Sequence, residues 1–458
     1  MMEILTVEIG DDRTAPGIAA AIHRLVRCGT LEVGQRLPTV RALASGLGVS
    51  PTTVSEAWQS LASAGAIEAR GRNGTVVLGP IDAVRGPRRY RGVTGSPGRF
   101  AIDLSTGTPE PSLLPDLSGA LANVASQHRP VVSYSDDPVL PELAAVLRSS
   151  WPFVAESITV VDGAMDALDR IASSLVHFGD VVLVETPTFP PLIDLLEQLG
   201  ARVVGVELDS EGMTVASLRA GLACDPVALF TQPRAQNPTG ASLTAARRRT
   251  LSKLLVESNA IIVEDDHCGA LAATTLESFG VRFPRRTVHI RGYSKSHGPD
   301  LRLAALGGAA SVVDAVASRR MLGPSWSSRL LQAVLHELLI DPATDITIRN
   351  AASIYGSRRA LLHSQGIGTA SHDGINVWIK VADTNDAVLA CAALGIGVAP
   401  GAPFFVGKAH PRLGANWTGS DCEYVRVTLA PWPAEPADLL RHLATALNAE
   451  AGASRPQR

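Results

Sequence analysis

The chain has 458 residues, more than one compact core usually holds, so we expect two or three domains. Apolar residues make up 46% of the chain and charged residues 19%, which excludes an intrinsically disordered protein. Because the formal net charge is −3, contact with nucleic acid must depend on local basic patches rather than on the whole surface.

The first 13 residues include four acidic side chains and no long apolar run, so we expect no signal peptide. No stretch reaches the roughly 18 continuous apolar residues that a membrane helix needs. The five cysteines are scattered, without a CxxC pair or the spacing of a zinc site, so we expect reduced thiols and no bound metal. These features predict a cytoplasmic protein without a membrane partner.

Residues 1–78 are expected to form a small unit of three helices and a hairpin. A first helix with apolar residues at helical spacing precedes a turn, and a short second helix follows from Thr39. Ser50 is a suitable N-cap for the third helix, and Pro51 occupies a first helical position, where its missing N–H is not needed. Residues 66–78 then predict a hairpin with a glycine-rich tip.

Residues 79–100 are rich in proline, glycine and arginine, a composition typical of a linker. Such a basic segment is either a solvated tether or an additional contact to the DNA backbone.

From residue 101 onward, short apolar runs alternate with helical patterns, which predicts an α/β domain with a mostly parallel sheet over 101–343. A long helix over 344–364 then leads into a smaller α+β unit, 344–458, with strands near 376–381 and 424–429. The candidate buried strands of the large unit are Ile158–Val161, Val181–Val184, Arg202–Val206, Val227–Thr231, Ala260–Glu264 and Thr287–Arg291.

The helices and hairpin of the first unit have the order of a winged helix-turn-helix, which places one helix in the major groove and the wing on the DNA backbone. The motifs Leu37–Ala44, Gly48–Val54, Leu61–Ile67 and Gly71–Thr75 resemble the GntR family of regulators. That resemblance implies DNA contacts by Arg41, Ser50, Thr52, Thr53 and Arg70. Pro51 and Ser55 stand where the family often has arginine. The alternative is a helical module for protein contacts.

A second set of residues fits the chemistry of pyridoxal 5′-phosphate (PLP), which needs a lysine amine, a carboxylate for its pyridine nitrogen and a site for its phosphate. Lys295 is the best of four lysines, because it lies directly after a predicted buried strand. Lys253 lies in a polar helix stretch, Lys380 ends a strand and Lys408 lies in a loop.

The other parts follow predicted strands in the same way. Asp265 stands where its carboxylate meets a pyridinium, and Asn237, in the sequence Asn-Pro-Thr-Gly, offers an amide to the phenolic oxygen. Gly163, Ala164 and Met165 open a helix and form a natural anion site. Two further side chains complete the set: Arg302, which can pair with the phosphate, and Phe189, which can stack on the ring.

Together these motifs resemble the fold-type-I, class I aminotransferases and, with the N-terminal unit, the MocR subfamily of GntR regulators. The resemblance implies Lys295 as the Schiff-base residue, with Ser294 beside it in the cofactor site. It also implies that Arg426 holds a substrate carboxylate and that Tyr134 reaches the cofactor phosphate of a partner subunit.

The chain departs from the aminotransferase pattern at several positions. His267 replaces a tyrosine two residues after Asp265, and it can still donate a hydrogen bond to the phenolic oxygen. Gly292 replaces a hydroxyl residue three positions before Lys295, which removes a phosphate contact. Val139 and Ala144 stand where family members tend to have glycine and arginine. These changes bear on catalytic efficiency more than on cofactor binding.

The leading hypothesis is therefore a DNA-binding transcriptional regulator that responds to PLP or to an amino compound that reacts with it. We expect a homodimer that presents two reading helices to two half-sites of an operator. One alternative is an active aminotransferase with an incidental N-terminal module, and another is a repressor that has lost its cofactor.

Overall fold

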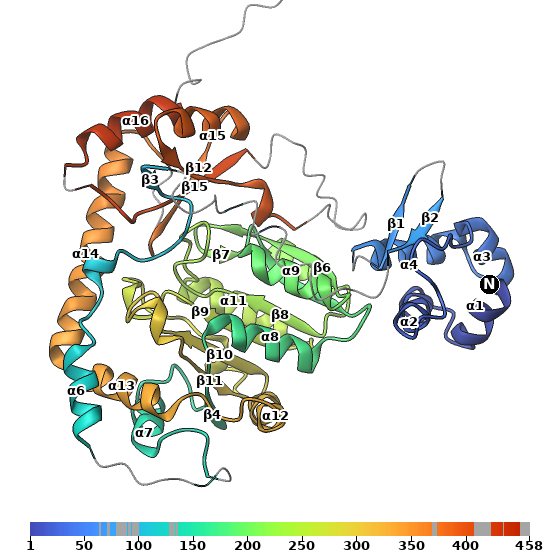
Figure 1. Ribbon diagram of the computed structural model, residues 1–458, viewed down its shortest axis with the longest axis horizontal. Coiled ribbons are helices and arrows are strands. Elements are labelled where there is room, and N and C mark those ends of the chain that lie inside the picture. Colours follow the sequence, from blue (N-terminus) through green and yellow to red (C-terminus); the bar gives the residue numbers. More distant parts are fainter. Residues whose placement is uncertain are drawn as a thin grey trace, which may run out of the picture.

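A computed structural model describes residues 1–63, 66–70, 74–78, 89, 93, 100–127, 133, 136–368, 373–406, 423–433 and 435–448. It shows a small helical unit at the N-terminus, a large α/β unit and a smaller C-terminal unit (Figure 1).

The N-terminal unit buries its apolar residues between four helices and a two-stranded sheet. Thr14 and Thr39 cap the second and third helices through their hydroxyls, and the left-handed Gly48 ends the third. The first helix was not predicted, and it adds Leu5 and Ile9 to the same core. The elements are α1 (Met2–Ile9), α2 (Ala15–Arg27), α3 (Val40–Leu47), α4 (Pro51–Ser63) and the antiparallel pair β1 (Ile67–Ala69) and β2 (Thr75–Val77).

An eight-stranded sheet forms the centre of the large unit, with the order β4-β11-β10-β9-β8-β5-β6-β7. The five strands from β10 to β6 are parallel to one another, and β11 is antiparallel to both of its neighbours. The sequence did not indicate β11, because its alanines and glycines give a weak strand signal. The strands are β4 (Ser157–Val161), β5 (Val181–Thr186), β6 (Arg202–Asp209), β7 (Gly212–Met213), β8 (Ala228–Thr231), β9 (Ile261–Asp266), β10 (Thr287–Gly292) and β11 (Ala304–Gly308).

Helices cover both faces of this sheet. One buried cluster joins α8 (Ala164–Leu175), α9 (Pro190–Gln198) and α12 (Ala310–Met321) to the sheet, and another joins α10 (Val215–Leu222) and α11 (Ala245–Leu255). Three further helices pack at the β4 edge: α6 (Ser118–Ser126), α7 (Pro141–Ser149) and α13 (Arg329–Ile340). Short 3-10 turns are η2 (Pro111–Leu113), η3 (Gly269–Leu271), η4 (Phe279–Val281), η5 (Pro299–Leu301) and η6 (Ala402–Phe404).

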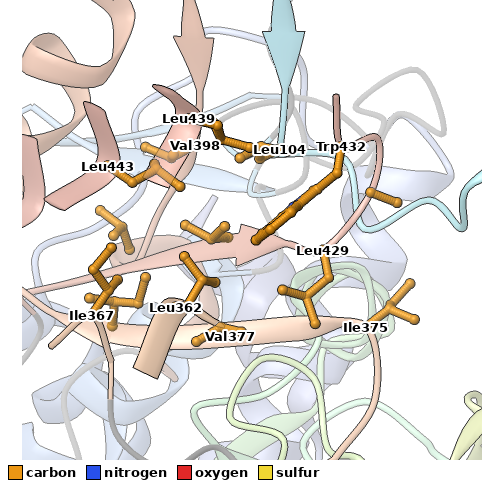
Figure 2. Close-up of a cluster of buried hydrophobic side chains, with 14 of the residues drawn as sticks. Leu104, Leu362, Ile367, Ile375, Val377, Val398, Leu429, Trp432, Leu439 and Leu443 are labelled. Carbon is orange, nitrogen blue, oxygen red and sulfur yellow. The ribbon is translucent and has the colours of Figure 1, made fainter. Parts of the chain in front are cut away.

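The C-terminal unit has its own apolar core, in which Leu362, Val377 and Trp432 meet (Figure 2). It receives one strand from far away in the sequence, because β3 (Ile102–Asp103) pairs with β13 (Ile396–Gly397) and the adjacent Leu104 joins this core. The first residues of the segment predicted as the large unit therefore pack with the small one. Its other elements are α14 (Pro342–Ser364), β12 (Asn376–Lys380), α15 (Thr384–Ala393), β14 (Ala399–Pro400), β15 (Tyr424–Thr428) and α16 (Ala437–Asn448).

Within the described ranges, none of the helices combines the length and the apolar character that crossing a membrane requires.

Candidate functional site

Three neighbouring parallel strands bring two predicted cofactor residues, Asp265 and Lys295, together with Gln232 at one edge of the large sheet. Gln232 follows β8, Asp265 lies near the end of β9, and Lys295 follows β10. Because the carboxyl ends of parallel strands share an edge, these side chains converge where open α/β sheets commonly bind ligands.

Asp265 presents a buried carboxylate oxygen to this edge. Its Oδ2 accepts a hydrogen bond from Nε2 of Gln232 at 2.8 Å, whereas its buried Oδ1 has no hydrogen-bond partner among the described residues. Burial raises the pKa of Asp265 to about 6, although the bond from Gln232 acts in the opposite direction. A buried acceptor without a partner is costly, so this oxygen fits a ligand that brings a donor, such as a pyridinium N–H.

Lys295 lies half-buried in the loop after β10, and its Nζ donates to the carbonyl oxygen of Gly107. Burial and the nearby charge of Arg426 lower the pKa of Lys295 to about 8. About a tenth of the amine is therefore unprotonated at pH 7, far more than at its ordinary pKa, and this is the form that attacks a carbonyl carbon.

Asn237 is tied to the same network from both its backbone and its side chain. Its backbone N–H donates to Oε1 of Gln232 at 2.8 Å, and its Oδ1 accepts from Nη1 of Arg426 at 3.2 Å. Because the side-chain oxygen is engaged, the amide NH₂ is the part of Asn237 that remains to donate to a ligand.

His267 lies beyond Asp265 with its ring half-buried, and its Nδ1 has no hydrogen-bond partner among the residues described. Burial and the charge of Lys295 lower the pKa of His267 to about 4. The imidazole is therefore neutral at physiological pH, with one nitrogen able to donate. The role of His267 as a donor that replaces tyrosine stays a prediction.

An anion cradle forms where α8 begins. Gly163 has a φ of 104°, and a Cβ added there would lie 3.4 Å from Nη2 of Arg302. The first backbone N–H groups of α8 and this guanidinium therefore lie close together, which suits a phosphate. Two acids flank the cradle, Asp162 and Asp166, and the buried Arg320 pairs with both, at 3.0 and 2.8 Å.

Arg426, on β15, is almost fully buried at 2% exposure. Its Nη2 donates to the carbonyl of Ser105, and its guanidinium carbon lies 5.0 Å from the centre of the Phe404 ring. Gly107, with a φ of 67°, completes this wall, since a Cβ there would lie 3.4 Å from Nη1 of Arg426. The arginine fork thus borders the pocket that contains Lys295, where it can receive a carboxylate.

In the N-terminal unit, several of the residues that are predicted to contact DNA are exposed. Arg41 on α3 and Thr52 on α4 are exposed. Ser50 caps α4, because its Oγ accepts from the backbone N–H of Thr53 at 3.1 Å, and the two hydroxyls lie 2.9 Å apart. Arg70, at the end of β1, pairs with Glu68 at 2.7 Å. The DNA contacts of these residues stay predictions.

Comparison with known proteins gives two matching families. Residues 14–77 match the family described as bacterial regulatory proteins, gntR family, and residues 101–394 match aminotransferase class I and II. The vitamin B6 salvage pathway transcriptional repressor PtsJ of Salmonella typhimurium is 35% identical over 380 residues, which are 81% of this chain and 86% of that protein. The HTH-type transcriptional regulator TauR of Rhodobacter capsulatus is 28% identical, over 85% of this chain and 91% of that protein.

The chain belongs to the MocR subfamily of GntR-type transcriptional regulators. Its cofactor is PLP, in keeping with its aminotransferase class I and II domain. The α-aminoadipate aminotransferase LysN of Thermus thermophilus superposes with a TM-score of 0.67 at 20% identity, over 79% of this chain and 96% of that one. This likeness confirms the predicted fold-type-I architecture.

For three of the predicted site residues of this MocR regulator, the structure gives less information than for the others. Tyr134 lies outside the described residues. Phe189, at the N-cap of α9, and Ser294, beside Lys295, are half-buried, and their contacts with PLP stay predictions.

Sequence reasoning missed three residues that the structure adds to the site. Gln232 joins Asp265 to Asn237, Gly107 faces both Lys295 and Arg426, and Phe404 lies against Arg426. A polar residue directly after a predicted buried strand was the available signal for Gln232. Gly107 and Phe404 come from distant segments, and their local sequences carry no comparable signal.

Proposed function

We propose that this MocR regulator binds operator DNA with an affinity that depends on PLP or on an amino compound that reacts with it. The observation that carries this proposal is the buried Oδ1 of Asp265, which lacks a partner in the described structure beside an amine of lowered pKa, Lys295. When bound, PLP supplies an electrophilic carbon that reacts with amines. In the proposal Lys295 holds the cofactor, Asp265 accepts from its ring nitrogen, and Arg302 with Gly163 holds its phosphate.

The name of one relative supports a vitamin B6 compound as the effector. PtsJ is called a repressor of the vitamin B6 salvage pathway, and this chain is 35% identical to it over 81% of its own length. We extend that link to the present chain as part of the proposal. A ligand changes DNA affinity only if it binds one conformation of the joined domains better than another, so the coupling is a difference in free energy that can be measured.

We also propose that the regulator is a homodimer. Three helices, α6, α13 and α14, lie next to one another in Figure 1, and each has an exposed apolar side chain. Leu121, Leu330 and Ile346 are 50%, 63% and 51% exposed. We propose that these three residues belong to the dimer interface, because large contiguous apolar surfaces mark protein interfaces. A twofold dimer presents two reading helices to half-sites that are about 34 Å apart, or a multiple of that distance.

The test is binding of the full-length protein to the DNA that flanks its own gene, at fixed salt, with PLP removed and then restored. We expect the dissociation constant for this fragment to change on restoration and to return when PLP is removed again. If the dissociation constant for the DNA does not change with PLP but changes when an amine is added, the effector is a compound other than PLP. An absence of specific binding in both states, together with turnover of an amino acid and a keto acid, overturns the regulator proposal in favour of an aminotransferase.

A further inference from the structure

Arg320, near the end of α12, is a buried cation next to the residues that flank the anion cradle. It is 1% exposed, and its guanidinium donates to four oxygens. Two of them are carboxylate oxygens, Oδ2 of Asp166 at 2.8 Å and Oδ2 of Asp162 at 3.0 Å. The other two are the carbonyl of Ser325 at 2.9 Å and the hydroxyl of Ser327 at 3.1 Å. These partners compensate the cost of burying the charge.

Asp162, which lies directly before the N-cap of α8, is held at each of its polar atoms. Its Oδ2 accepts from Arg320, and its Oδ1 accepts from the hydroxyl of Ser327 at 2.5 Å. Its backbone N–H donates to Oδ2 of Asp166 at 3.1 Å, and its carbonyl accepts from Nη2 of Arg302 at 3.4 Å. Asp162 therefore connects Arg320 to both parts of the proposed phosphate site, the start of α8 and the guanidinium of Arg302.

The two carboxylates suit an anion site only if a cation compensates their charge. Asp162 precedes the cradle and Asp166 lies in the first turn of α8, so both charges are near the site proposed for the phosphate. An uncompensated carboxylate there repels a phosphate dianion and competes with it for the guanidinium of Arg302. Arg170 also pairs with Asp166, at 2.8 Å, but its side chain is 21% exposed and therefore better screened by solvent. The buried charge of Arg320 acts on both acids at once.

We propose that Arg320 is a positioning residue for the phosphate of PLP, and that its contacts with Asp162 and Asp166 give this regulator its preference for a phosphorylated vitamin B6 compound. The inference rests on the proposed function, in which Gly163 and Arg302 hold the phosphate. Arg320 fixes the backbone at the start of α8, so the first N–H groups of that helix are oriented in advance. It also prevents the two acids from drawing Arg302 away from the phosphate.

The test compares two ligands that differ only at one ring position. PLP and 5-deoxypyridoxal have the same ring and the same aldehyde, but 5-deoxypyridoxal has a methyl group where PLP has its phosphate-bearing arm. Each is titrated into full-length protein freed of cofactor, and its dissociation constant is measured from the visible absorbance at fixed pH and salt. The dissociation constant of 5-deoxypyridoxal divided by that of PLP is the phosphate preference.

Arg320→Met removes the charge and keeps an unbranched side chain. We expect the phosphate preference to fall about tenfold or more, because PLP binds more weakly while the affinity for 5-deoxypyridoxal changes by less than about twofold. Arg320→Lys keeps the charge but not the bidentate geometry, so it should retain part of the preference. The matched control is Arg319→Met, at an exposed position on the same helix, which should keep the wild-type preference.

Ser327→Ala supplies a second variant, because loss of one partner from a buried ion pair can prevent folding of Arg320→Met. This substitution removes only a hydroxyl, which binds Oδ1 of Asp162, and leaves Arg320 and both acids in place. The side chain of Asp162 is then held by one bond fewer. We expect the phosphate preference to fall roughly three- to tenfold, again through weaker binding of PLP.

The phosphorus resonance of bound PLP distinguishes a positioning role from a general loss of structure. The second ionisation of a phosphate monoester has a pKa of about 6, and carboxylates without a compensating cation raise that pKa. In Arg320→Met we therefore expect the ³¹P shift of bound PLP to titrate at a higher pH than in the wild type, measured between pH 5.5 and 8.5. A general loss of structure would not shift this titration in a definite direction.

An unchanged phosphate preference in Ser327→Ala overturns the inference, as does Arg320→Met with the preference and the phosphorus titration of the wild type. Equal weakening of both ligands overturns it too, since Arg320 then serves only the stability of the fold. A wild-type protein that binds the two ligands equally well removes the phosphate site from the proposed function as well. The response of DNA binding to PLP tests the regulator proposal separately.

Discussion

Nε2 of Gln232 donates to Oδ2 of Asp265 at 2.8 Å, while Oε1 of the same side chain accepts from the backbone N–H of Asn237 at 2.8 Å. One buried amide therefore fixes the two residues that are predicted to bind the pyridine nitrogen and the phenolic oxygen of the cofactor. The bond also leaves only Oδ1 of Asp265 for a ligand, so the direction of the carboxylate is set before the cofactor enters.

Replacement of Gln232 by leucine should weaken PLP binding. A lost hydrogen bond to a charged group costs about 1.5–3 kcal/mol, so we expect an affinity roughly 10- to 100-fold lower. Because the bond from Gln232 lowers the pKa of Asp265, its loss should also raise that pKa above about 6. PLP affinity, followed by cofactor absorbance between pH 5.5 and 8.5, should then stay weak up to a higher pH in the variant than in the wild type. An unchanged affinity and pH profile would contradict the role given to Gln232.

Asp265→Asn should make the cofactor-free protein more stable and at the same time weaken PLP binding. The folded pKa of about 6 lies above the ordinary 3.8, so the ionised carboxylate destabilises the cofactor-free fold. Its contribution to stability is intact below pH 4 and is lost as the pH rises through 6. At 1.36 kcal/mol per pH unit, the variant should gain roughly 2–3 kcal/mol at pH 7.5 and nothing at pH 4, measured by denaturant unfolding without PLP. PLP affinity should fall in the same variant. Equal stability of both proteins at pH 7.5 would show that the carboxylate is better solvated than its burial indicates.

Attachment of PLP should depend on the free amine of Lys295. Its pKa of about 8 means that the rate at which the visible absorbance band appears should rise with pH, reach half of its maximum near pH 8 and level off above about pH 9. Lys295→Ala should show no such band at any pH. Lys253→Ala is the matched control, since this lysine is exposed on the helix α11. Persistence of the band in Lys295→Ala would assign attachment to another amine.

The sequence predicted the parts of this site that depend on local order. Asp265, Asn237 and Lys295 each follow or end a buried strand, and parallel strands necessarily bring such positions to one edge. The helix start at Gly163 could be predicted for the same reason. What could not be predicted is how remote segments complete the pocket. Gly107 reaches Lys295 across 188 residues, and this contact depends on the tertiary fold.

The same limit applies to the linker. Its proline, glycine and arginine content predicted a tether, and within 79–100 the structure describes only residues 89, 93 and 100. Nothing in the local sequence indicates that Val93 is buried in a cluster with Trp378, Ala399, Phe404 and Phe405. The alternative was that arginines of this segment contact the DNA backbone. Apart from Arg89, the arginines of 79–99 lie outside the described residues.

Gly292→Ser should strengthen PLP binding by restoring a hydroxyl that the aminotransferase pattern places beside the phosphate. A Cβ at Gly292 would meet Cα of His267 at 3.5 Å and Cβ of Ala164 at 3.8 Å, which are ordinary contacts, and its φ is not left-handed. The site therefore has room for the side chain next to the start of α8. One additional hydrogen bond to a charged phosphate corresponds to roughly tenfold in affinity. Gly292→Ala is the control: a similar gain with alanine would show that the effect comes from the backbone rather than from the hydroxyl.

Arg41→Ala tests whether the N-terminal unit contacts DNA through the helix α3. Arg41 is exposed on α3, and the family resemblance places it against DNA, so its removal should weaken binding to the operator fragment. If the contact is to a phosphate, the slope of log affinity against log salt should become shallower by about 1, because one fewer counterion is released. A contact to a base edge should instead reduce discrimination between operator and unrelated DNA, with less change in the slope. Arg441→Ala is the matched control, because this arginine is also exposed but lies on α16 with Asp438 as its partner, far from α3 (Figure 1). If Arg41→Ala and Arg441→Ala have the same affinity, slope and discrimination, Arg41 does not face DNA, and Thr52 is left as the exposed predicted contact on α4.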